Sequence, residues 1–288
     1  MIRWSASVAS DDAYLLGEGP FWDGPRGRVL WVDVDRGTVH AGLLDGERVV
    51  PVDAWQLDRT VGAVVCSADG ELLVAGAQVL LTIDGARRGD PLISGRRRFN
   101  DGACDPVGRF LVGTLALDEP AGHEVLLRVE DDGSATVLDD DLTLSNGLAW
   151  SVDGSLLYSV DTIPGVVWVR SYDAATGAVG PRREWVRLAD GWPDGLCVDA
   201  QDHVWVAVWG GGQVRRFAPD GSLVGVVDVP APHTTSVAFV GDDLDVLLIT
   251  TATAQLDAAR LAEFPDSGRH FLARVGVTGH PVTAWAGP

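Results

Sequence analysis

The chain has 288 residues, of which 46% are hydrophobic, and it carries 22 Lys plus Arg against 41 Asp plus Glu, for a formal net charge of −19. Such a charge repels phosphate backbones and anionic lipid headgroups, so it argues against a nucleic-acid or membrane partner. Every basic residue is arginine, and the lack of lysine excludes a P-loop lysine and Schiff-base chemistry.

Six similar segments follow one another along the chain. Each consists of an apolar strand, a polar turn and a second strand rich in Val, Leu and Trp, and turns are predicted at Asp69-Gly70, Pro106–Gly108 and Asp153-Gly154. Successive segments begin roughly 40 to 48 residues apart, which is the length of one four-stranded propeller blade. The dipeptides that mark the six starts are Glu18-Gly19, Val61-Gly62, Asp101-Gly102, Asn146-Gly147, Asp194-Gly195 and Thr235-Ser236.

The sequence therefore predicts an all-β fold, a six-bladed β-propeller with four-stranded blades around a central channel, with residues 1–288 as a single domain. We expect IRWSASV at 2–8 to pair with the last blade and close the ring, because an open ring leaves an exposed edge. TAQLDAARLAEFP at 253–265 is the one segment with helical character. A two-sheet sandwich is less favoured, since its strands need not recur with a fixed period.

Four of the six markers carry an oxygen side chain: Glu18, Asp101, Asn146 and Asp194. If the first strand of each repeat lies innermost, these side chains meet at one mouth of the channel. Each Asp-Gly or Asn-Gly pair is also an ordinary turn former. Their shared register nevertheless favours a cation site, because carboxylate and amide oxygens suit calcium, magnesium and manganese, and zinc accepts them.

The stretch RRRFNDGACDP at 96–106 places arginine beside this site. We interpret Arg96 and Arg97 as solvated loop residues and Arg98 as a group that binds a substrate oxygen or stabilises an oxyanion. No pair of the six histidines has the spacing of a transition-metal cage; His233, just ahead of the last marker, is the possible exception.

Long motifs at these positions resemble one known family. They are LGEGPFWD, RRRFNDGACDPVGRFLVGTL, LSNGLAWSVDGSLLYSVD, WPDGLCVDAQDHVWVAVWGGGQVRRFAPDG and HTTSVAF. They resemble the regucalcin, gluconolactonase and luciferin-regenerating-enzyme (senescence-marker-protein) family over essentially the whole chain. The resemblance implies a six-bladed propeller with one divalent cation near the channel mouth, and hydrolysis of sugar lactones.

The resemblance also implies residue roles. The metal ligands fall on Glu18, Asn146 and Asp194, and the substrate-contacting pair falls on Arg98 and Asn100.

A further sugar-contacting glutamate of the family matches Asp118, which is one methylene shorter and is followed by Glu119. This difference leaves the sugar preference open.

These residues suggest a mechanism for opening an aldonolactone. The cation polarises the carbonyl, and Asp194 takes a proton from the attacking water, with Asp101 as the second candidate for this role. Arg98 and Asn100 orient the sugar hydroxyls. The cation itself stays open among calcium, zinc, manganese, magnesium and iron(II).

Two alternatives remain from the sequence. One is a calcium-dependent phosphotriesterase or arylesterase on a similar propeller, and the other is a non-catalytic metal- or protein-binding propeller. Acidic residues in the channel beside an arginine favour catalysis on a small-molecule sugar lactone, and no protein partner is implied.

The cellular location is predicted from the cysteines and the N-terminus. Cys66, Cys104 and Cys197 are scattered, which is typical of reduced thiols, and the N-terminal residues lack the pattern of a signal peptide. A cytoplasmic location is therefore expected.

Overall fold

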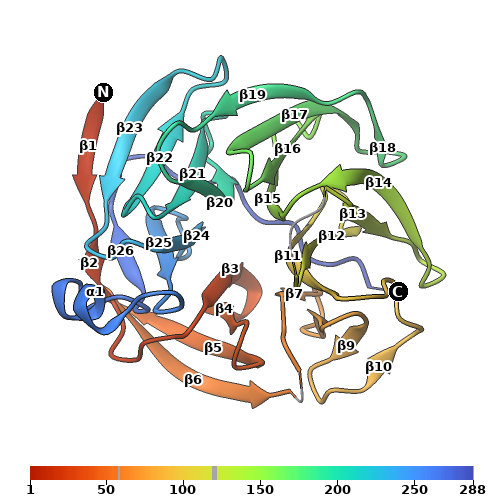
Figure 1. Ribbon diagram of the computed structural model, residues 1–288, viewed down its shortest axis with the longest axis horizontal. Coiled ribbons are helices and arrows are strands. Elements are labelled where there is room, and N and C mark those ends of the chain that lie inside the picture. The colour runs from red at the N-terminus through yellow and green to blue at the C-terminus, as the bar shows by residue number, and fades with distance from the viewer. Residues whose placement is uncertain (58, 119–121, 288) are drawn as a thin grey trace.

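The computed structural model describes residues 1–57, 59–118 and 122–287. Its strands form six sheets that are arranged as blades around a central channel (Figure 1). In each sheet the first strand of the repeat lies innermost, and the following strands lie progressively further out. The six-bladed β-propeller predicted from the repeat is confirmed.

The first three blades are four-stranded antiparallel sheets in chain order. Blade 1 contains β3 (Gly17–Asp23), β4 (Arg28–Asp33), β5 (Thr38–Asp45) and β6 (Arg48–Gln56), with a short 3-10 helix at Gly24–Arg26. Blade 2 contains β7 (Ala63–Cys66), β8 (Leu72–Ala75), β9 (Leu80–Thr82) and β10 (Arg87–Arg88). Blade 3 contains β11 (Arg97–Cys104), β12 (Phe110–Ala116), β13 (Glu124–Val129) and β14 (Ala135–Leu142).

The last three blades depart slightly from this plan. Blade 4 contains β15 (Ser145–Trp150), β16 (Leu156–Asp161) and β17 (Val166–Asp173), and both β18 (Ala178–Val179) and β19 (Arg183–Arg187) pair with β17. Blade 5 contains β20 (Trp192–Val198), β21 (Val204–Trp209), β22 (Gln213–Phe217) and β23 (Leu223–Asp228). Blade 6 contains β24 (Thr234–Val240), β25 (Val246–Thr251) and β26 (Phe271–Ala273), with helix α1 (Ala258–Glu263) between the last two.

The N-terminal segment closes the ring in a different way from the one expected. Only β2 (Ser7–Val8) pairs with the last blade, as its fourth strand beside β26, while β1 (Ile2–Ser5) pairs in parallel with β23 of blade 5. The expectation that the whole segment joins the last blade was therefore wrong for β1. The physical reason is Trp4, whose ring covers Gly225 of β23 and lies 5.5 Å from the ring of Trp205.

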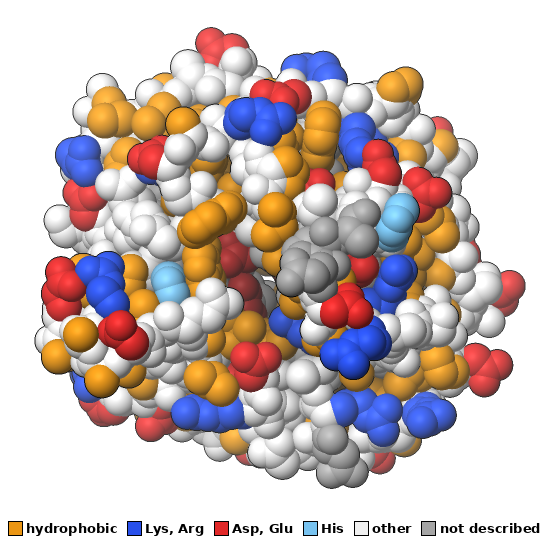
Figure 2. All heavy atoms as spheres, viewed as in Figure 1, with side chains coloured by type: hydrophobic (Ala, Val, Ile, Leu, Met, Phe, Trp, Pro, Cys, Tyr) orange, Lys and Arg blue, Asp and Glu red, His pale blue; other side chains and the backbone are white. Residues whose placement is uncertain are grey.

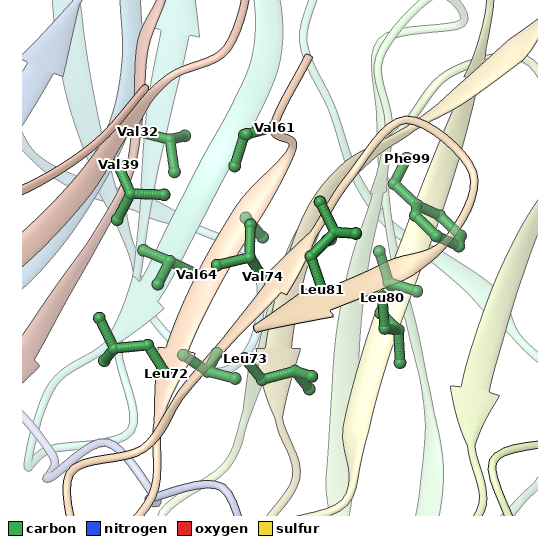
Figure 3. Packing of buried hydrophobic residues seen from close by; sticks show 14 of the residues in the cluster. Val32, Val39, Val61, Val64, Leu72, Leu73, Val74, Leu80, Leu81 and Phe99 are labelled. Carbon is green, nitrogen blue, oxygen red and sulfur yellow. The ribbon is translucent and has the colours of Figure 1, made fainter. Parts of the chain in front are cut away.

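Apolar packing between neighbouring blades forms the core. Figure 3 shows Val32 and Val39 of blade 1 facing Val64 of blade 2, while Leu80 of blade 2 lies toward Phe99 of blade 3. β-branched and aromatic side chains suit such strands, because each inner strand is buried on both faces. The predicted turns are present as well, and Gly154 supplies the positive φ of 70° that the β15–β16 turn requires.

The C-terminal residues cross the far end of the channel from blade 5 to blades 2 and 3 (Figure 1). We call residues 278–286 the C-terminal strap. The amide of His280 donates to Val198 O, and the amides of Trp285 and Ala286 donate to Cys66 O and Gly108 O. A cavity of about 320 Å³ lies between the strap and the inner strands, and apolar side chains line it together with Asp101, Ser151, Asp153, Ser236, His280 and Thr283. All three cysteines are free, as expected.

Candidate active site

The innermost strands bring the six repeat markers to one mouth of the channel. β3, β7, β11, β15, β20 and β24 contact one another in this order around the ring, and β24 returns to β3. The marker lies near the start of each strand, so the equivalent ends of the strands meet. The site predicted from the repeat register is thus assembled by the ring itself.

A local break in strand pairing occurs at five of these markers. The register between the first and second strands shifts at Glu18–Phe21, Phe99–Gly102, Ser145–Leu148, Pro193–Leu196 and Thr234–Ser236. Such bulges redirect side chains and are common beside active sites.

The glycine of the marker has its own role. A Cβ atom on Gly147 would lie 2.7 Å from the Asp194 carbonyl oxygen, and one on Gly195 would lie 2.0 Å from Ser236 Oγ. Glycine therefore permits the close approach of neighbouring inner strands.

Glu18, Asn146 and Asp194 are buried at this mouth, and Asp101 is half-buried. Among the residues that the structure describes, neither Asn146 Oδ1 nor Asp194 Oδ1 has a hydrogen-bond partner, although both atoms are inaccessible to solvent. The Asn146 amide nitrogen donates to Thr162 Oγ1 at 3.2 Å, so the amide oxygen lies on the opposite side of the amide group from Thr162. Buried oxygens without donors are costly unless a cation or ligand group approaches them.

The pKa values of the clustered acids also favour a positive charge at this position. Burial, followed by the charges of Asp194 and Asp101, raises the pKa of Glu18 well above its ordinary value. Burial and the charge of Asp101 likewise raise the pKa of Asp194. Burial raises the pKa of Asp101 to about 6. Three carboxylates that repel one another in a buried site are stabilised by a positive charge among them.

The residues present fit a divalent cation when the amide is included. Within the described ranges, no three His, Cys, Asp or Glu side chains are grouped so as to hold a metal ion by themselves. Glu18 and Asp194 supply two carboxylates, and the free Oδ1 of Asn146 supplies a third oxygen. Such a mixed oxygen set is suitable for a hard cation with positions left open. The ligand assignment itself stays a prediction.

The two remaining markers are closed. Thr235 Oγ1 donates to Gly17 O at 2.6 Å and lies 2.8 Å from Thr250 Oγ1, and Val61 is fully buried and apolar. The side-chain oxygens of the cluster therefore come from the other four markers, Glu18, Asp101, Asn146 and Asp194.

Arg98 is buried beside the cluster, as expected. Its Nη1 donates to Phe99 O at 2.9 Å and to Asn100 Oδ1 at 2.8 Å. Burial lowers the pKa of Arg98, against the charges of Asp35, Glu18 and Asp194. None of the carboxylates in the described part of the chain forms an ion pair with Arg98, so its other N–H groups are available to a ligand.

Asn100 lies between Arg98 and blade 4 and is hydrogen-bonded at both ends of its amide. Its Oδ1 accepts from Arg98, and its Nδ2 donates to Ser145 O at 3.0 Å. Both ends of the amide are therefore engaged, and Asn100 holds Arg98 against blade 4.

Asp118 is exposed, and its Oδ2 lies 3.4 Å from Nε of Arg96. Substrate contact by Asn100 and Asp118 stays a prediction, and Glu119 lies outside the described residues.

The structure adds residues that the sequence did not single out. Thr162, in the turn after β16, joins Asn146 to blade 5 by donating to Pro193 O at 3.0 Å. His233 makes no hydrogen bond to the acidic cluster among the described residues. Its ring stacks on that of Trp209, with the centroids 4.0 Å apart, and its Nδ1 lies 2.9 Å from Ala254 O. A threonine after a strand has no distinctive sequence signal, so Thr162 could not have been found without the fold.

The chain is similar in sequence to a known family and to named members of it. The family model described as SMP-30/Gluconolactonase/LRE-like region matches residues 16–253. Pentonolactonase XacC of Haloferax volcanii is 35% identical over 282 residues, covering 94% of each chain. The 6-deoxy-6-sulfogluconolactonase of Pseudomonas putida is also 35% identical over 282 residues, covering 95% of this chain and 96% of the relative.

The fold is shared with a solved relative over nearly the whole chain. The crystal structure of a calcium-binding protein, regucalcin, from Agrobacterium tumefaciens str. C58 has a TM-score of 0.90 and 27% sequence identity, covering 99% of this chain and 98% of that one. No helix among the residues described is long and apolar enough to cross a membrane.

Proposed function

The chain belongs to the SMP-30/Gluconolactonase/LRE-like family, and we propose that it hydrolyses the ring ester of an aldonolactone with one divalent cation at the channel mouth. It is an enzyme of the sugar-lactonase type, in keeping with the lactonases among its relatives. Hydrolysis adds water across the ester bond and gives the open-chain aldonic acid.

One observation supports the cation most directly. No donor in the described ranges reaches the buried Oδ1 atoms of Asn146 and Asp194, and these atoms lie beside Glu18, a carboxyl whose pKa is raised by burial and by neighbouring acids. Glu18, Asn146 and Asp194 would hold the cation. When bound, a divalent cation supplies Lewis-acid polarisation of the ester carbonyl. The oxygen donors suit calcium, manganese, magnesium and iron(II), and zinc accepts them.

The other charged groups prepare the substrate. The free N–H groups of Arg98 face the ligand from blade 3, where they bind a ring hydroxyl or the negative charge that develops on the carbonyl oxygen. Asn100 keeps the guanidinium in place through its bond to Nη1, and its bond to Ser145 O fixes this pair to blade 4. The proposed role of Asn100 is thus to position Arg98.

A carboxylate takes the proton of the attacking water. Asp194 is the first candidate, because its Oδ1 faces the cluster without a donor. Asp101 is the second, because its pKa of about 6 lies close to neutral pH, where a general base is most effective. An Asp101→Asn variant tests the second role, since it keeps the size of the side chain and removes the base.

The esterase alternative has less support. An arylesterase type relies on histidine near the metal, and His233 is engaged with Trp209 and Ala254 O instead. A purely protein-binding propeller does not need a cluster of buried acids at its channel mouth. Both alternatives are nevertheless included in the experiment below.

The test is a substrate panel under controlled metal content. The protein is stripped with a chelator and reconstituted separately with Ca²⁺, Mn²⁺, Mg²⁺, Fe²⁺ and Zn²⁺, and then assayed on gluconolactone, xylonolactone, arabinonolactone, a phenyl ester and an organophosphate. We expect lactone hydrolysis that is lost on stripping and restored by at least one cation. Faster turnover of the ester or the organophosphate, or no turnover with any cation, would contradict the proposal.

A further inference from the structure

Two large apolar side chains are exposed beside the mouth, next to the candidate ligands. Ile163, in the turn between β16 and β17, is 47% exposed, and Trp192, the first residue of β20, is also 47% exposed. We call Ile163 and Trp192 the apolar rim. Figure 2 shows the hollow at the centre of this face, with acidic side chains deep within it and hydrophobic side chains at its edge. Exposed apolar side chains beside a hollow are typical of ligand contact.

Hydrogen bonds connect the apolar rim to the candidate ligands. The Asn146 amide donates to Thr162 Oγ1, and Thr162 Oγ1 donates to Pro193 O. Ile163 follows Thr162 in the chain, and Trp192 precedes Pro193. The rim is therefore held at a fixed position relative to Asn146 and Asp194.

The Trp192 side chain also rests on a rigid support. Its ring covers Gly210, where an added Cβ would lie 3.5 Å from the indole Cζ3 atom. Trp192 pairs with Trp209 across β20 and β21, and the ring of Trp209 stacks on His233 with an interplanar angle of 13°. A half-exposed indole on such a support offers a preformed apolar surface.

The mouth thus presents two different surfaces to a ligand. Arg98 offers hydrogen-bond donors from blade 3, whereas the apolar rim comes from blades 4 and 5. A sugar lactone has a matching division, since its hydroxyls project from the ring edge and its C–H groups lie on the ring faces. An apolar surface accepts C–H groups but penalises an ionic group that would lose its water.

We propose that the apolar rim is a specificity subsite, in which Trp192 and Ile163 pack against the C–H face and exocyclic carbons of the lactone and disfavour an anionic substituent there. This inference rests on the proposed function and deepens it by defining the substrate class as neutral lactones. The net charge of −19 acts in the same direction, because it repels phosphorylated or sulfonated substrates.

The first experiment compares Trp192→Ala and Trp192→Phe on gluconolactone and its 6-phosphate. For Trp192→Ala we expect KM for gluconolactone to rise about tenfold, a typical effect for a small apolar pocket, with little change in kcat. Trp192→Phe should keep most of the affinity. The ratio of kcat/KM for gluconolactone to kcat/KM for its 6-phosphate should be smaller in Trp192→Ala than in wild type. Leu223→Ala, at a 40% exposed position on β23 of the same blade, is the control and should behave as wild type.

The second experiment separates this inference from the lactonase proposal. Binding of 1,5-anhydroglucitol, a sugar ring without an ester, is measured by saturation-transfer NMR with wild type, Trp192→Ala and Leu223→Ala. Weaker binding in Trp192→Ala alone supports the subsite even if no lactone is hydrolysed. Unchanged KM values and unchanged binding of 1,5-anhydroglucitol in Trp192→Ala would overturn the subsite proposal even if lactone hydrolysis is confirmed. The absence of 1,5-anhydroglucitol binding to wild type would overturn it as well.

Discussion

Asp194 and Asp199 lie at opposite ends of the innermost strand of blade 5, and both are buried, yet their surroundings differ completely. Asp199 is 0% exposed and accepts hydrogen bonds from Trp205 Nε1 at 3.0 Å and from Arg216 Nε at 2.9 Å, besides two backbone amides. Asp194 is 4% exposed; Asn146 and the Gly195 amide interact with its carboxylate, but its Oδ1 has no donor among the described residues. The first carboxylate is satisfied by the protein, whereas the second is available to a ligand.

The same difference recurs in blade 3. Asp105 accepts from Arg109 Nε at 2.6 Å and from Tyr172 OH at 2.5 Å, whereas Asp101, within the described part of the chain, accepts only from the amide of Gly102. The far ends of these two inner strands thus use their acid to fasten the turn. The mouth end keeps its acid free for a site. Burial alone does not separate the two roles, but the hydrogen-bond partners do.

The largest expected effect is on catalysis at the mouth end. Asp194→Ala removes a candidate ligand and the candidate base together, so we expect kcat/KM for the preferred lactone to fall by at least about a hundredfold, the lower range for losing a general base. Far-UV circular dichroism should stay unchanged, because Asp194 fastens no turn. Near-normal turnover in this variant would show that the comparison assigns the wrong role to Asp194.

The next effect is on stability at the far end. Asp199→Ala leaves Arg216 and Trp205 Nε1 buried without their acceptor, so we expect the free energy of unfolding to fall by about 3–5 kcal/mol. Urea denaturation of both alanine variants measures this. Asp194→Ala serves as the matched control, and it should lose far less stability than Asp199→Ala. Equal losses in the two variants would remove the distinction between the two ends.

A smaller effect is expected in the pH dependence of the metal-free protein. Burial and the charges of neighbouring acids raise the pKa of Glu18 and Asp194 above their usual values, and burial raises the pKa of Asp101 to about 6. Carboxyls of the unfolded chain titrate near pH ~4, so the folded protein holds more protons above that pH, and its stability falls as pH rises through about 6. A cation binds the deprotonated acids, so its stabilisation grows over the same range.

Thermal melts in EDTA and in excess Ca²⁺ or Mn²⁺, from pH 5 to pH 8, check this prediction. Asp194→Asn should reduce the decrease in melting temperature between low and high pH in the metal-free protein.

His270 provides an opposite control. Burial lowers its pKa to about 3, and stability is therefore lost as pH falls from about 6.5 toward 3. His270→Phe should change only this acid side. A cation effect that is independent of pH would contradict the proposed ligands.

Much of the site could be predicted from the sequence because its signals are local. Glu18, Asn146 and Asp194 each stand directly before a glycine at the same point of a repeat, and the ring places equal points of a repeat at one mouth. The role of Asn100 could not be predicted in this way. Its engagement with Ser145 O joins two blades across 45 residues, and no local pattern records such a contact.

The sequence by itself determined the six-bladed propeller and the register of the candidate ligands, since strand alternation, turn glycines and a fixed period act over short distances. Only the tertiary structure decided which buried acids are satisfied, how the N-terminal strands divide between two blades, and where Ile163 and Trp192 lie. The physical reason is that donors such as Arg216, and the turn that carries Thr162, reach these positions from distant parts of the chain.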